Sequence, residues 1–568
     1  MLFRFKILLI NCLLFFAISN SYSTEKKSLN WKIKNPVWTK NFEEKYEEFI
    51  ATLGKASKSG FCHKTSDCLK SPKANPFYYH LNPNNLVDVF SDCADLPYIL
   101  RAYFAWMNDL PFAYPTVLTQ VEKIELTPEQ QNIQNEISDL ESAISRAGFF
   151  KKRILKVKLG ILKRRLGRVH RKGDIRYNQF GNNIISKKYI KDGDNINSVI
   201  TTVGEYISTA SFRTNASNNT TNELFRDTYP VRIAKSAIKA GTVLYDPNGH
   251  IAVVYEVTKT GKIHLIDAHP DNSLTNITYG DKFSRTRVDV GGGFSNWRPF
   301  SVLNGEINAT PNEKLSDYSL EQFQKEKEFT INNVKMTFSE YVRNKLSEGT
   351  LILKPLIELN EILEELCNDV KERVIAVNDS LNANLQNQSH PESLPDNIYG
   401  TDGDWEKYSS PSRDARLKAS IREARNSVLK MINGYKNNEA NIFYEGQDLI
   451  SDLKEIYKNS TNKCVFEIKK SNGENASLNL DQVLENIYKL SFDPYHCSEL
   501  RWGLLDAESL KSCGQSKDKM NWFEAEQGLR NKIDRDYSVL TDYNLQELKD
   551  APISNTKSEK ISIKEILN

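Results

Sequence analysis

The chain has 568 residues, 26% of them charged and 39% hydrophobic, with a formal net charge of +3. This length allows several domains with cores of their own, and a charge so close to zero gives no reason to expect a nucleic-acid partner. Beyond the N-terminus, no segment reaches the roughly 20 apolar residues that a membrane-spanning helix needs. We therefore expect a protein that does not span a membrane.

The N-terminal segment is typical of a secretory signal peptide. Arg4 and Lys6 precede an apolar run at 7–18, and the small residue Ser23 follows this run. We expect cleavage after Ser23, so that residues 1–23 are removed and the mature protein is exported to the periplasm or secreted. Such a protein folds where disulfides form and persist.

The cysteine count predicts one free thiol. Seven of the eight cysteines lie in the mature chain, and an odd number leaves one unpaired in an oxidising compartment. Two pairs are near in sequence among turn-forming or polar residues, and a third pair remains, although other connectivities stay open. A zinc site at 62–68 is the rival interpretation, but its spacing fits no common zinc pattern, so we expect no metal and no cofactor. The expected bridges are Cys62–Cys68, Cys497–Cys513 and Cys367–Cys464, and the free thiol is Cys93.

Residues 24–90 combine turn residues with scattered aromatic side chains, and we expect an irregular segment there. A strong helix follows, because apolar residues recur at helical spacing from Leu96 until Leu110-Pro111 ends the run. Its first residues include a cysteine, Cys93. Near a helix N-terminus, free N–H groups and the helix dipole favour a nucleophilic thiolate.

The start of this helix allows two N-caps. Asp92 would place Cys93 within the first turn, but Pro97 would then leave the Cys93 carbonyl without its hydrogen bond. Asp95 as the N-cap puts Pro97 in the first turn, where proline is tolerated, and leaves Cys93 just outside the helix. The second arrangement weakens the dipole argument without removing it.

Residues 121–175 predict two helices. The motif at 127–130 resembles a capping box that opens the first helix, and the second, at 151–170, is rich in Lys and Arg and has no acidic residue. One interpretation is a basic face for an anionic polymer or a membrane surface. We favour an antiparallel helical hairpin, because leucines repeat along the second helix as a packing seam.

After a polar, loop-like stretch at 173–230, the chain predicts β structure from 240 to 299. If residues 258–261 form a four-residue turn, counting outward pairs His250 with His269 and puts Asp267 on the same face as His250. A three-residue loop with a bulge at Gly261 would slip the register and send Asp267 to the opposite face. The first register places a carboxylate beside the imidazole, as a catalytic triad requires.

Beyond Leu303 the periodicity is almost wholly helical, and we expect a separate helical domain. The expected helical segments are 316–347, 352–380, 412–435, 443–458, 480–490 and 519–548.

Several of these motifs resemble the NlpC-type peptidoglycan endopeptidases of the papain-like superfamily. The resemblance rests on Asp92-Cys93-Ala94-Asp95-Leu96, on the strand 241–245 and on His250-Ile251-Ala252-Val253-Val254-Tyr255. Ala94-Asp95 stands where the family has Ser-Gly, and Thr242 where it has Asp. Leu100-Arg101-Ala102 is also similar to transglutaminase-like proteases. Either resemblance implies Cys93 as nucleophile, His250 as general base and Asp267 or His269 as the third polar residue.

The expected fold class is therefore α+β, with a papain-like core, a helical-hairpin insertion and a mostly helical C-terminal domain. The expected function is an exported cysteine peptidase or amidase acting on peptidoglycan or another envelope polymer. A transglutaminase-like acyl transferase and a non-catalytic envelope-binding protein are the alternatives. The remaining histidines, His390 and His496 among them, are expected to be structural. The expected divisions are 1–23 (signal peptide), 24–120 (nucleophile helix), 121–175 (hairpin), 176–303 (β part) and 304–568 (helical domain), with Tyr245, Trp297 and Arg298 as substrate-binding residues.

Overall fold

The structure is a computed structural model. In the part of the chain that it describes, no helix is both long enough and apolar enough to cross a membrane. The expected signal peptide and Thr127 of the capping box lie outside the described residues. These are 26–86, 88–121, 128–147, 149–170, 174–217, 226–270, 272–324, 329–331, 334–400, 403–514, 516–535 and 540–568.

The fold mixes helices with antiparallel sheets and is organised around a six-stranded sheet of order β3-β8-β4-β5-β6-β7. Its strands have apolar residues on both faces, so the sheet is buried on both sides. Ile251 and Val253 of β5 belong to the core on one face, and Ala252 and Val254 to the core on the other. The strands are β3 (Thr228–Pro230), β4 (Val243–Asp246), β5 (His250–Val257), β6 (Ile263–Ala268), β7 (Leu274–Thr278) and β8 (Gly293–Trp297).

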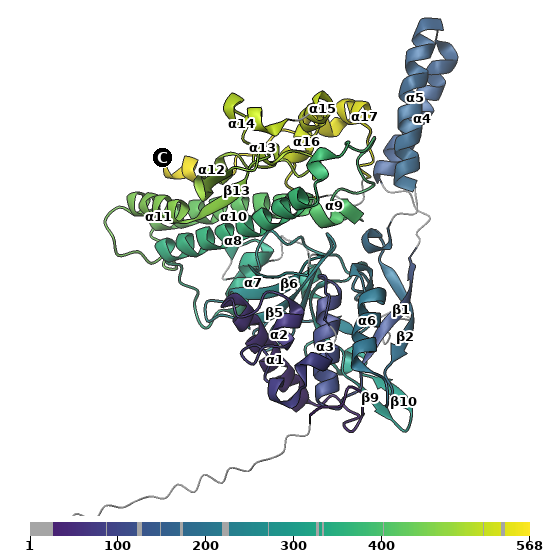
Figure 1. The fold of residues 1–568 in the computed structure, drawn as a ribbon, viewed down its shortest axis with the longest axis vertical. Helices are drawn as coiled ribbons and strands as arrows, with labels where there is room; N and C mark the ends of the chain where they lie inside the picture. Colours follow the sequence, from purple (N-terminus) through teal and green to yellow (C-terminus); the bar gives the residue numbers. More distant parts are fainter. Residues whose placement is uncertain are drawn as a thin grey trace, which may run out of the picture.

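One face of the sheet is covered by α1 (Lys40–Lys58) and α3 (Asp95–Met107), with α2 (Thr65–Leu69) beside them (Figure 1). The irregular segment expected at 24–90 is therefore wrong for α1, whose apolar residues recur at helical spacing and are buried. Helix α1 lies very close to β5. A Cβ built on Gly54 would stand 2.3 Å from the Cβ of Tyr255, so only glycine fits at this crossing.

The opposite face is covered in part by residues from the segment 316–347, which the sequence assigns to the helical domain. The hairpin β9 (Phe300–Leu303) and β10 (Glu306–Ala309) follows β8. The short pair β11 (Thr330–Ile331) and β12 (Val334–Lys335) and then α7 (Phe338–Leu346) come next. Phe338, Val342 and Leu346 of α7 pack in the same core as Ala252 and Val254 of β5. The continuous helix expected at 316–347 is thus wrong except for α7.

A separate helical core begins with α8 (Pro355–Asn382) and contains α10 (Pro411–Lys436) and α11 (Leu449–Lys463). The strands β13 (Val465–Lys469) and β14 (Asn475–Asn479) form a hairpin that the sequence did not predict. Figure 1 shows α8 and α10 lying across the sheet layer. The remaining helices are α9 (Gly403–Tyr408), α12 (Leu480–Glu485), α13 (Ser498–Arg501), α14 (Ala507–Cys513), α15 (Lys517–Ala525), α16 (Gln527–Asn531), α17 (Leu545–Asp550) and α18 (Ile563–Leu567).

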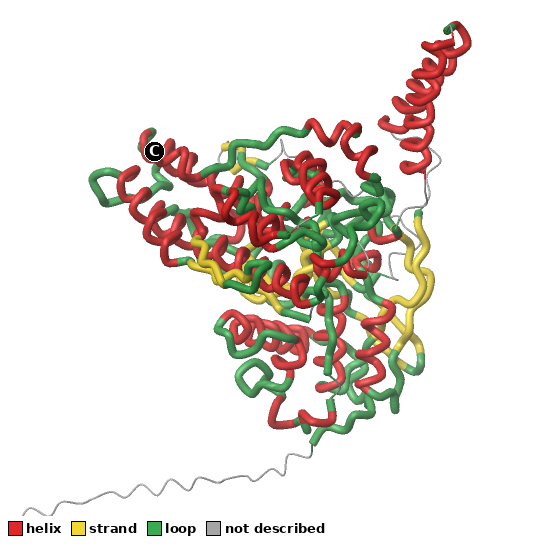
Figure 2. The backbone as a smooth tube through the Cα atoms, turned by 45° about the horizontal axis from the view of Figure 1, so that its top comes forward, coloured by secondary structure: helices red, strands yellow, loops and turns green. Residues whose placement is uncertain are grey.

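The expected helical hairpin is confirmed as α4 (Pro128–Arg146) and α5 (Phe149–His170), which pack against each other. Lys163 of α5 and Glu141 of α4 form an ion pair of 2.7 Å. The hairpin rises from the ribbon of β1 (Ala113–Gln120) and β2 (Asn182–Tyr189) and projects away from the body (Figures 1 and 2). Helix α6 (Ile196–Tyr206), which follows β2 and packs against α3, was missed by sequence reasoning.

The cysteine pairing expected from the sequence is present. Each bridge has Cα atoms close enough for an undistorted disulfide. Cys93 is the free cysteine of the described residues. The Cα–Cα distances are 5.1 Å for Cys62–Cys68, 6.0 Å for Cys367–Cys464 and 5.5 Å for Cys497–Cys513.

Candidate functional site

The β5–β6 hairpin has the expected register near His250, but its loop length differs from the prediction and a bulge compensates for the difference. At the turn Val257 pairs with Ile263, one residue away from expectation, so the loop has five residues rather than four. A bulge between Val254 and Glu256 then inserts one extra residue into β5 and restores the register to Val253 opposite Ile266. Continuing this register by one residue places Asp267 opposite Ala252, on the face of His250.

This register brings an imidazole and a carboxylate together. His250 Nε2 donates a hydrogen bond of 2.5 Å to Asp267 Oδ2. Thr275 of β7, which is paired with Asp267, donates to the other carboxylate oxygen. Both Asp267 and His250 are buried. Burial alone would raise the pKa of Asp267, but the nearby His269 and His250 and the hydrogen bonds from His250 and Thr275 hold it below its usual range.

His269 is close to this pair but is not the partner of His250. Its Nε2 lies 3.1 Å from Thr275 Oγ1 and 3.7 Å from Asp267 Oδ2, and its ring stacks on that of His250 with 6.0 Å between the centroids. Burial and the charge of Arg413 and other cations lower the pKa of His269, against the opposing effect of Asp267. His269 is therefore a neutral neighbour, and Asp267 is the residue that orients His250.

Cys93 lies at the open end of the same strand pair. Pairing of β5 with β6 begins at Val253, two residues after Ile251, so the strands are not joined there. The N–H of Ile251, the residue after His250, is bonded to the Cys93 sulfur. With Nε2 of His250 taken by Asp267, its Nδ1 is the nitrogen left for a thiol. Among the described residues, however, no hydrogen bond joins Cys93 to His250.

The N-terminus of α3 fixes the backbone of Cys93. Asp92 Oδ1 accepts hydrogen bonds from the N–H groups of Ala94 (2.8 Å) and Asp95 (3.1 Å), and the Leu96 N–H bonds to the Asp92 carbonyl. Helix α3 itself begins at Asp95 with Ala94 in the N-cap position, so Cys93 lies just before the helix, in a turn whose N–H groups Asp92 caps. No acceptor in the described part of the chain is bonded to the N–H of Cys93, which is free to bind an oxyanion.

The electrostatic surroundings of Cys93 differ from those expected for a stabilised thiolate. Burial raises the pKa of this thiol well above its ordinary value, and the charges of Asp92, Asp267 and Asp95 add to the effect, while the Ile251 N–H opposes it. Burial beside Asp92 also raises the pKa of Asp95, to about 9. The expectation that the helix N-terminus lowers the pKa of Cys93 is therefore wrong: its pKa is raised, which favours a neutral thiol at rest.

The β6–β7 turn and helix α2 hold the cysteine turn in place. The backbone N–H of Ser91, two residues before Cys93, donates a hydrogen bond of 3.2 Å to Asn272 Oδ1 in the β6–β7 turn. The Ser91 hydroxyl is 2.5 Å from that of Thr65, in the helix stapled by the first disulfide. Sequence reasoning missed these contacts and Thr275, although continued alternation beyond His269 would have indicated a third strand with Thr275 facing the site.

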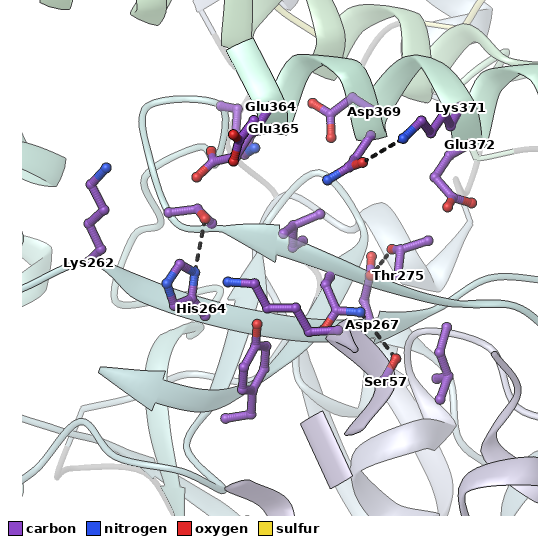
Figure 3. Close-up of a pocket in the computed structure, with 18 of the residues that line it drawn as sticks. Ser57, Lys262, His264, Asp267, Thr275, Glu364, Glu365, Asp369, Lys371 and Glu372 are labelled. Atoms are coloured by element: carbon purple, nitrogen blue, oxygen red, sulfur yellow. Dashed lines mark hydrogen bonds between the residues drawn. The ribbon is translucent and has the colours of Figure 1, made fainter. Parts of the chain in front are cut away.

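A cavity of about 730 Å³ reaches the site from the side of Asp267 and His269 (Figure 3). Its floor is formed by β6 and β7, and its roof by α8 and α10 of the helical domain. Cys93 and His250 themselves are not among its lining residues. The roof carries strong charge of both signs, from Glu364, Glu365 and Asp369 of α8 and Arg413 and Arg416 of α10.

The three residues expected to bind substrate lie inside the core instead of on a rim. Tyr245 is 2% exposed and its hydroxyl accepts from Arg213. Trp297 packs edge-on against Tyr98 with 5.0 Å between the ring centroids. Arg298 is 4% exposed and donates to the carbonyls of residues 226 and 310 and to a neighbouring Asn side chain. Their contacts are those of residues that stabilise the core, and no contact joins any of them to Cys93 in the described part of the chain.

Two groups of side chains in the described residues could hold a metal ion by proximity alone. One consists of Cys497, Glu499 and Cys513, whose cysteines are already joined in a disulfide. The other is a buried group around His390 in the helical domain, far from Cys93 in sequence, and of its members only His390 was considered in the sequence, as a structural residue.

Comparison of the chain with protein-family models, with curated proteins and with solved structures finds no match.

Proposed function

We propose that this protein is an exported cysteine hydrolase with a papain-like core, in which Cys93, His250 and Asp267 cleave an amide bond. The observation that carries the proposal is the 2.5 Å hydrogen bond between His250 and Asp267 at the strand end that also contacts the free thiol. A nucleophile, a base and a group that orients the base are the three parts that covalent acyl transfer needs.

Chain order and layering support the papain-like assignment. The cysteine lies just before a buried helix that packs on an antiparallel sheet, the histidine begins a strand of that sheet, and the carboxylate lies on the next strand. The long interval between Cys93 and His250 contains the β1–β2 ribbon with its helical hairpin and α6. These are additions to one layer that leave the proposed site intact.

The proposed chemistry starts from the neutral thiol. Nδ1 of His250 takes the Cys93 proton as the sulfur attacks the carbonyl carbon, and the N–H of Cys93 stabilises the oxyanion. The imidazolium then gives this proton to the leaving amine, and the C–N bond breaks to leave a thioester on Cys93. Water, deprotonated by His250, hydrolyses the thioester. Asp267 holds the imidazole and stabilises its charged form in both steps.

The cavity favours a polar, charged substrate over an apolar one. Acidic residues of α8 face the basic residues Arg413 and Arg416 of α10, so the lining suits a segment bearing both ammonium and carboxylate groups. Peptidoglycan or another envelope polymer is the substrate class that the resemblance and the expected export imply. Three disulfides in the described chain agree with an oxidising compartment.

Purified mature protein tests the proposal against isolated peptidoglycan and, separately, against its soluble peptides. We expect the parent to release new amino groups, and Cys93→Ala and His250→Ala each to lose at least about 10²-fold in rate. His264→Ala is the matched control, because His264 lies on β6 at the cavity but outside the proposed site. Equal rates for the parent and both site variants would exclude the mechanism. A labelled amine added to the same reaction identifies acyl transfer in place of hydrolysis.

A non-catalytic envelope-binding protein is the second candidate, favoured by one observation. Burial and three carboxylates raise the pKa of Cys93, as expected for an unreactive thiol. This candidate predicts that Cys93→Ala binds peptidoglycan as tightly as the parent and that neither protein releases amino groups. Trapping of an acyl-enzyme on Cys93 by mass spectrometry would exclude it.

A further inference from the structure

The helical domain buries a second group of chemically active side chains, remote from the proposed hydrolase site. His390 follows α8, Asp493 precedes α13, and Glu526 lies between α15 and α16. The side chains of His390 and Asp493 are fully buried, and Glu526 is 0% exposed. One ligand atom from each of the three lies within 4.8 Å of the others. We call this group the buried triad.

Each ring nitrogen of His390 faces an oxygen acceptor. Its Nδ1 donates to the carbonyl of Pro391 at 2.7 Å, which leaves Nε2 as the acceptor in the neutral ring. That Nε2 lies 2.9 Å from Asp493 Oδ2. At this distance either a proton on Nε2 or a metal ion must lie between the ring and the carboxylate. Metal-bound histidines are commonly oriented by such a bond from the other ring nitrogen to a backbone carbonyl.

Glu526 is the second, independent indication. Both of its carboxylate oxygens are buried without a hydrogen-bond partner. The nearest guanidinium nitrogen, on Arg530, is 3.8 Å from Oε2, and Arg530 directs its N–H groups at the carbonyl of Phe523 and the side chain of Gln527. A carboxylate removed from water without a partner is strongly unfavourable. Its position beside Asp493 makes a bound cation the natural partner of both.

We propose that His390 Nε2, Asp493 and Glu526 bind one divalent transition-metal ion of the zinc class. An imidazole together with carboxylates suits such ions, whereas calcium and magnesium prefer sites made of oxygen alone. Small movements bring the three atoms to the bond lengths of about 2.0–2.2 Å that zinc makes with N and O ligands. His496 borders the group, with Nε2 3.4 Å from Asp493 Oδ2, but its nitrogens are engaged by Ser491 Oγ (2.7 Å) and the Lys519 carbonyl (3.1 Å), so we do not include it as a ligand.

The ion would join three segments of the chain, of which the first and the last, at His390 and Glu526, are more than 100 residues apart in sequence. The ring of His390 stacks on Trp522 of α15 with 4.2 Å between centroids, so the triad lies within the aromatic cluster that packs these segments together. A buried ion there acts as an internal cross-link of the helical domain. This role is independent of the hydrolase site.

The test uses the full mature chain, stripped with a chelator and titrated with zinc alone. We expect uptake of one equivalent, with a rise of a few degrees in the thermal unfolding midpoint. Glu526→Gln removes the charge but keeps the shape, and we expect its zinc affinity to fall at least about tenfold. Glu499→Gln is the matched control, because Glu499 is equally buried but its oxygens are bonded to Ser471 and Ser512.

A shared proton is the competing explanation for the triad. It predicts that the stripped parent takes up less than about 0.1 equivalent of zinc without a change in midpoint, and that Glu526→Gln melts at or above the parent. That result would overturn the proposal. If Glu526→Gln fails to fold, the titration of the stripped parent decides alone: one equivalent with stabilisation supports the site, and no stabilised uptake excludes it.

Discussion

Asp267 contacts His250 directly and His269 only at longer range, although the two histidines flank it. The distance from Asp267 Oδ2 is 2.5 Å to Nε2 of His250 and 3.7 Å to Nε2 of His269. This difference assigns the orienting role to Asp267 and leaves His269 as a buried neighbour.

Asp267→Asn should therefore impair the proposed reaction more than any change at His269. The amide cannot stabilise the imidazolium, and we expect kcat to fall about 10²-fold or more. His269→Gln keeps a polar group near Thr275 and should retain kcat within a few-fold. The measurement is amine release from peptidoglycan under the conditions established for the parent. Similar losses for both variants would contradict the assignment of Asp267.

His269 should instead control stability toward acid. Burial and nearby cations lower its pKa in the folded state, so below the unfolded pKa of about 6.5 the unfolded chain binds the extra proton. Stability is therefore fully present above that pH and falls as the pH decreases toward the folded pKa. His269→Gln should reduce the slope between pH 6.5 and 4.5 by up to about 1.4 kcal/mol per pH unit. Urea unfolding at several pH values measures it, and an unchanged slope would contradict this interpretation.

Neutralising Asp92 should make Cys93 more reactive. Burial is the main cause of the raised pKa of the Cys93 thiol, and the charge of Asp92 is the next largest. An Asn at this position removes the charge but keeps the acceptor oxygen that caps the turn before α3. Each unit of pKa decrease raises the thiolate fraction about tenfold below the pKa, so Asp92→Asn should speed alkylation at pH 7 several-fold. Iodoacetamide labelling followed by peptide mass spectrometry measures the rate at Cys93. A slower or equal rate would mean that Asp92 does not destabilise the thiolate.

The two disulfides of the helical domain should differ in their contribution to stability. Cys367–Cys464 closes a separation of 97 residues and Cys497–Cys513 one of 16. The chain-entropy model gives about 4.7 and about 3.1 kcal/mol for such loops. Paired Cys→Ala variants, unfolded in urea without reductant, should therefore lose more stability at the first bridge. A larger loss at the second bridge would show that native packing, not loop closure, dominates.

Gly54→Ala should destabilise the contact between α1 and β5. The new methyl group would overlap the Tyr255 side chain at 2.3 Å, and overpacking of this kind costs about 1–3 kcal/mol. Gly204→Ala in α6 is the matched control, because its nearest new contact is an ordinary 3.4 Å; it should be neutral or stabilising by up to about 1 kcal/mol. Urea unfolding compares the two, and equal effects would argue against a tight crossing at Gly54.

Local patterns in the sequence predicted the features that depend on local chemistry. The odd cysteine count identified Cys93 as the free thiol, and alternation along 250–269 put Asp267 on the face of His250. Sequence reasoning missed helix α1 because it treated 24–90 as one irregular segment and did not weigh the helical spacing of Tyr46, Phe49 and Leu53, which form the buried face of α1. Nothing local distinguishes Trp297 and Arg298 as core residues, since their burial is imposed by segments distant in sequence.

The buried triad shows more clearly what sequence patterns cannot predict. His390, Asp493 and Glu526 have no common spacing, and each is unremarkable in its own segment. Only the packing of the helical domain makes them neighbours, and only the proximity of their ligand atoms and the missing hydrogen bonds of Glu526 single them out.

The bulge in β5 also restricts how this hairpin can change during evolution. The five-residue loop and the extra residue at Tyr255 compensate for each other, so Asp267 faces His250 only while both are kept or both are lost. A single-residue insertion or deletion in either place would turn the carboxylate to the opposite face of the sheet. Length changes in this hairpin should therefore occur in compensating pairs, and a homologue with a shorter turn should also have a regular, unbulged β5.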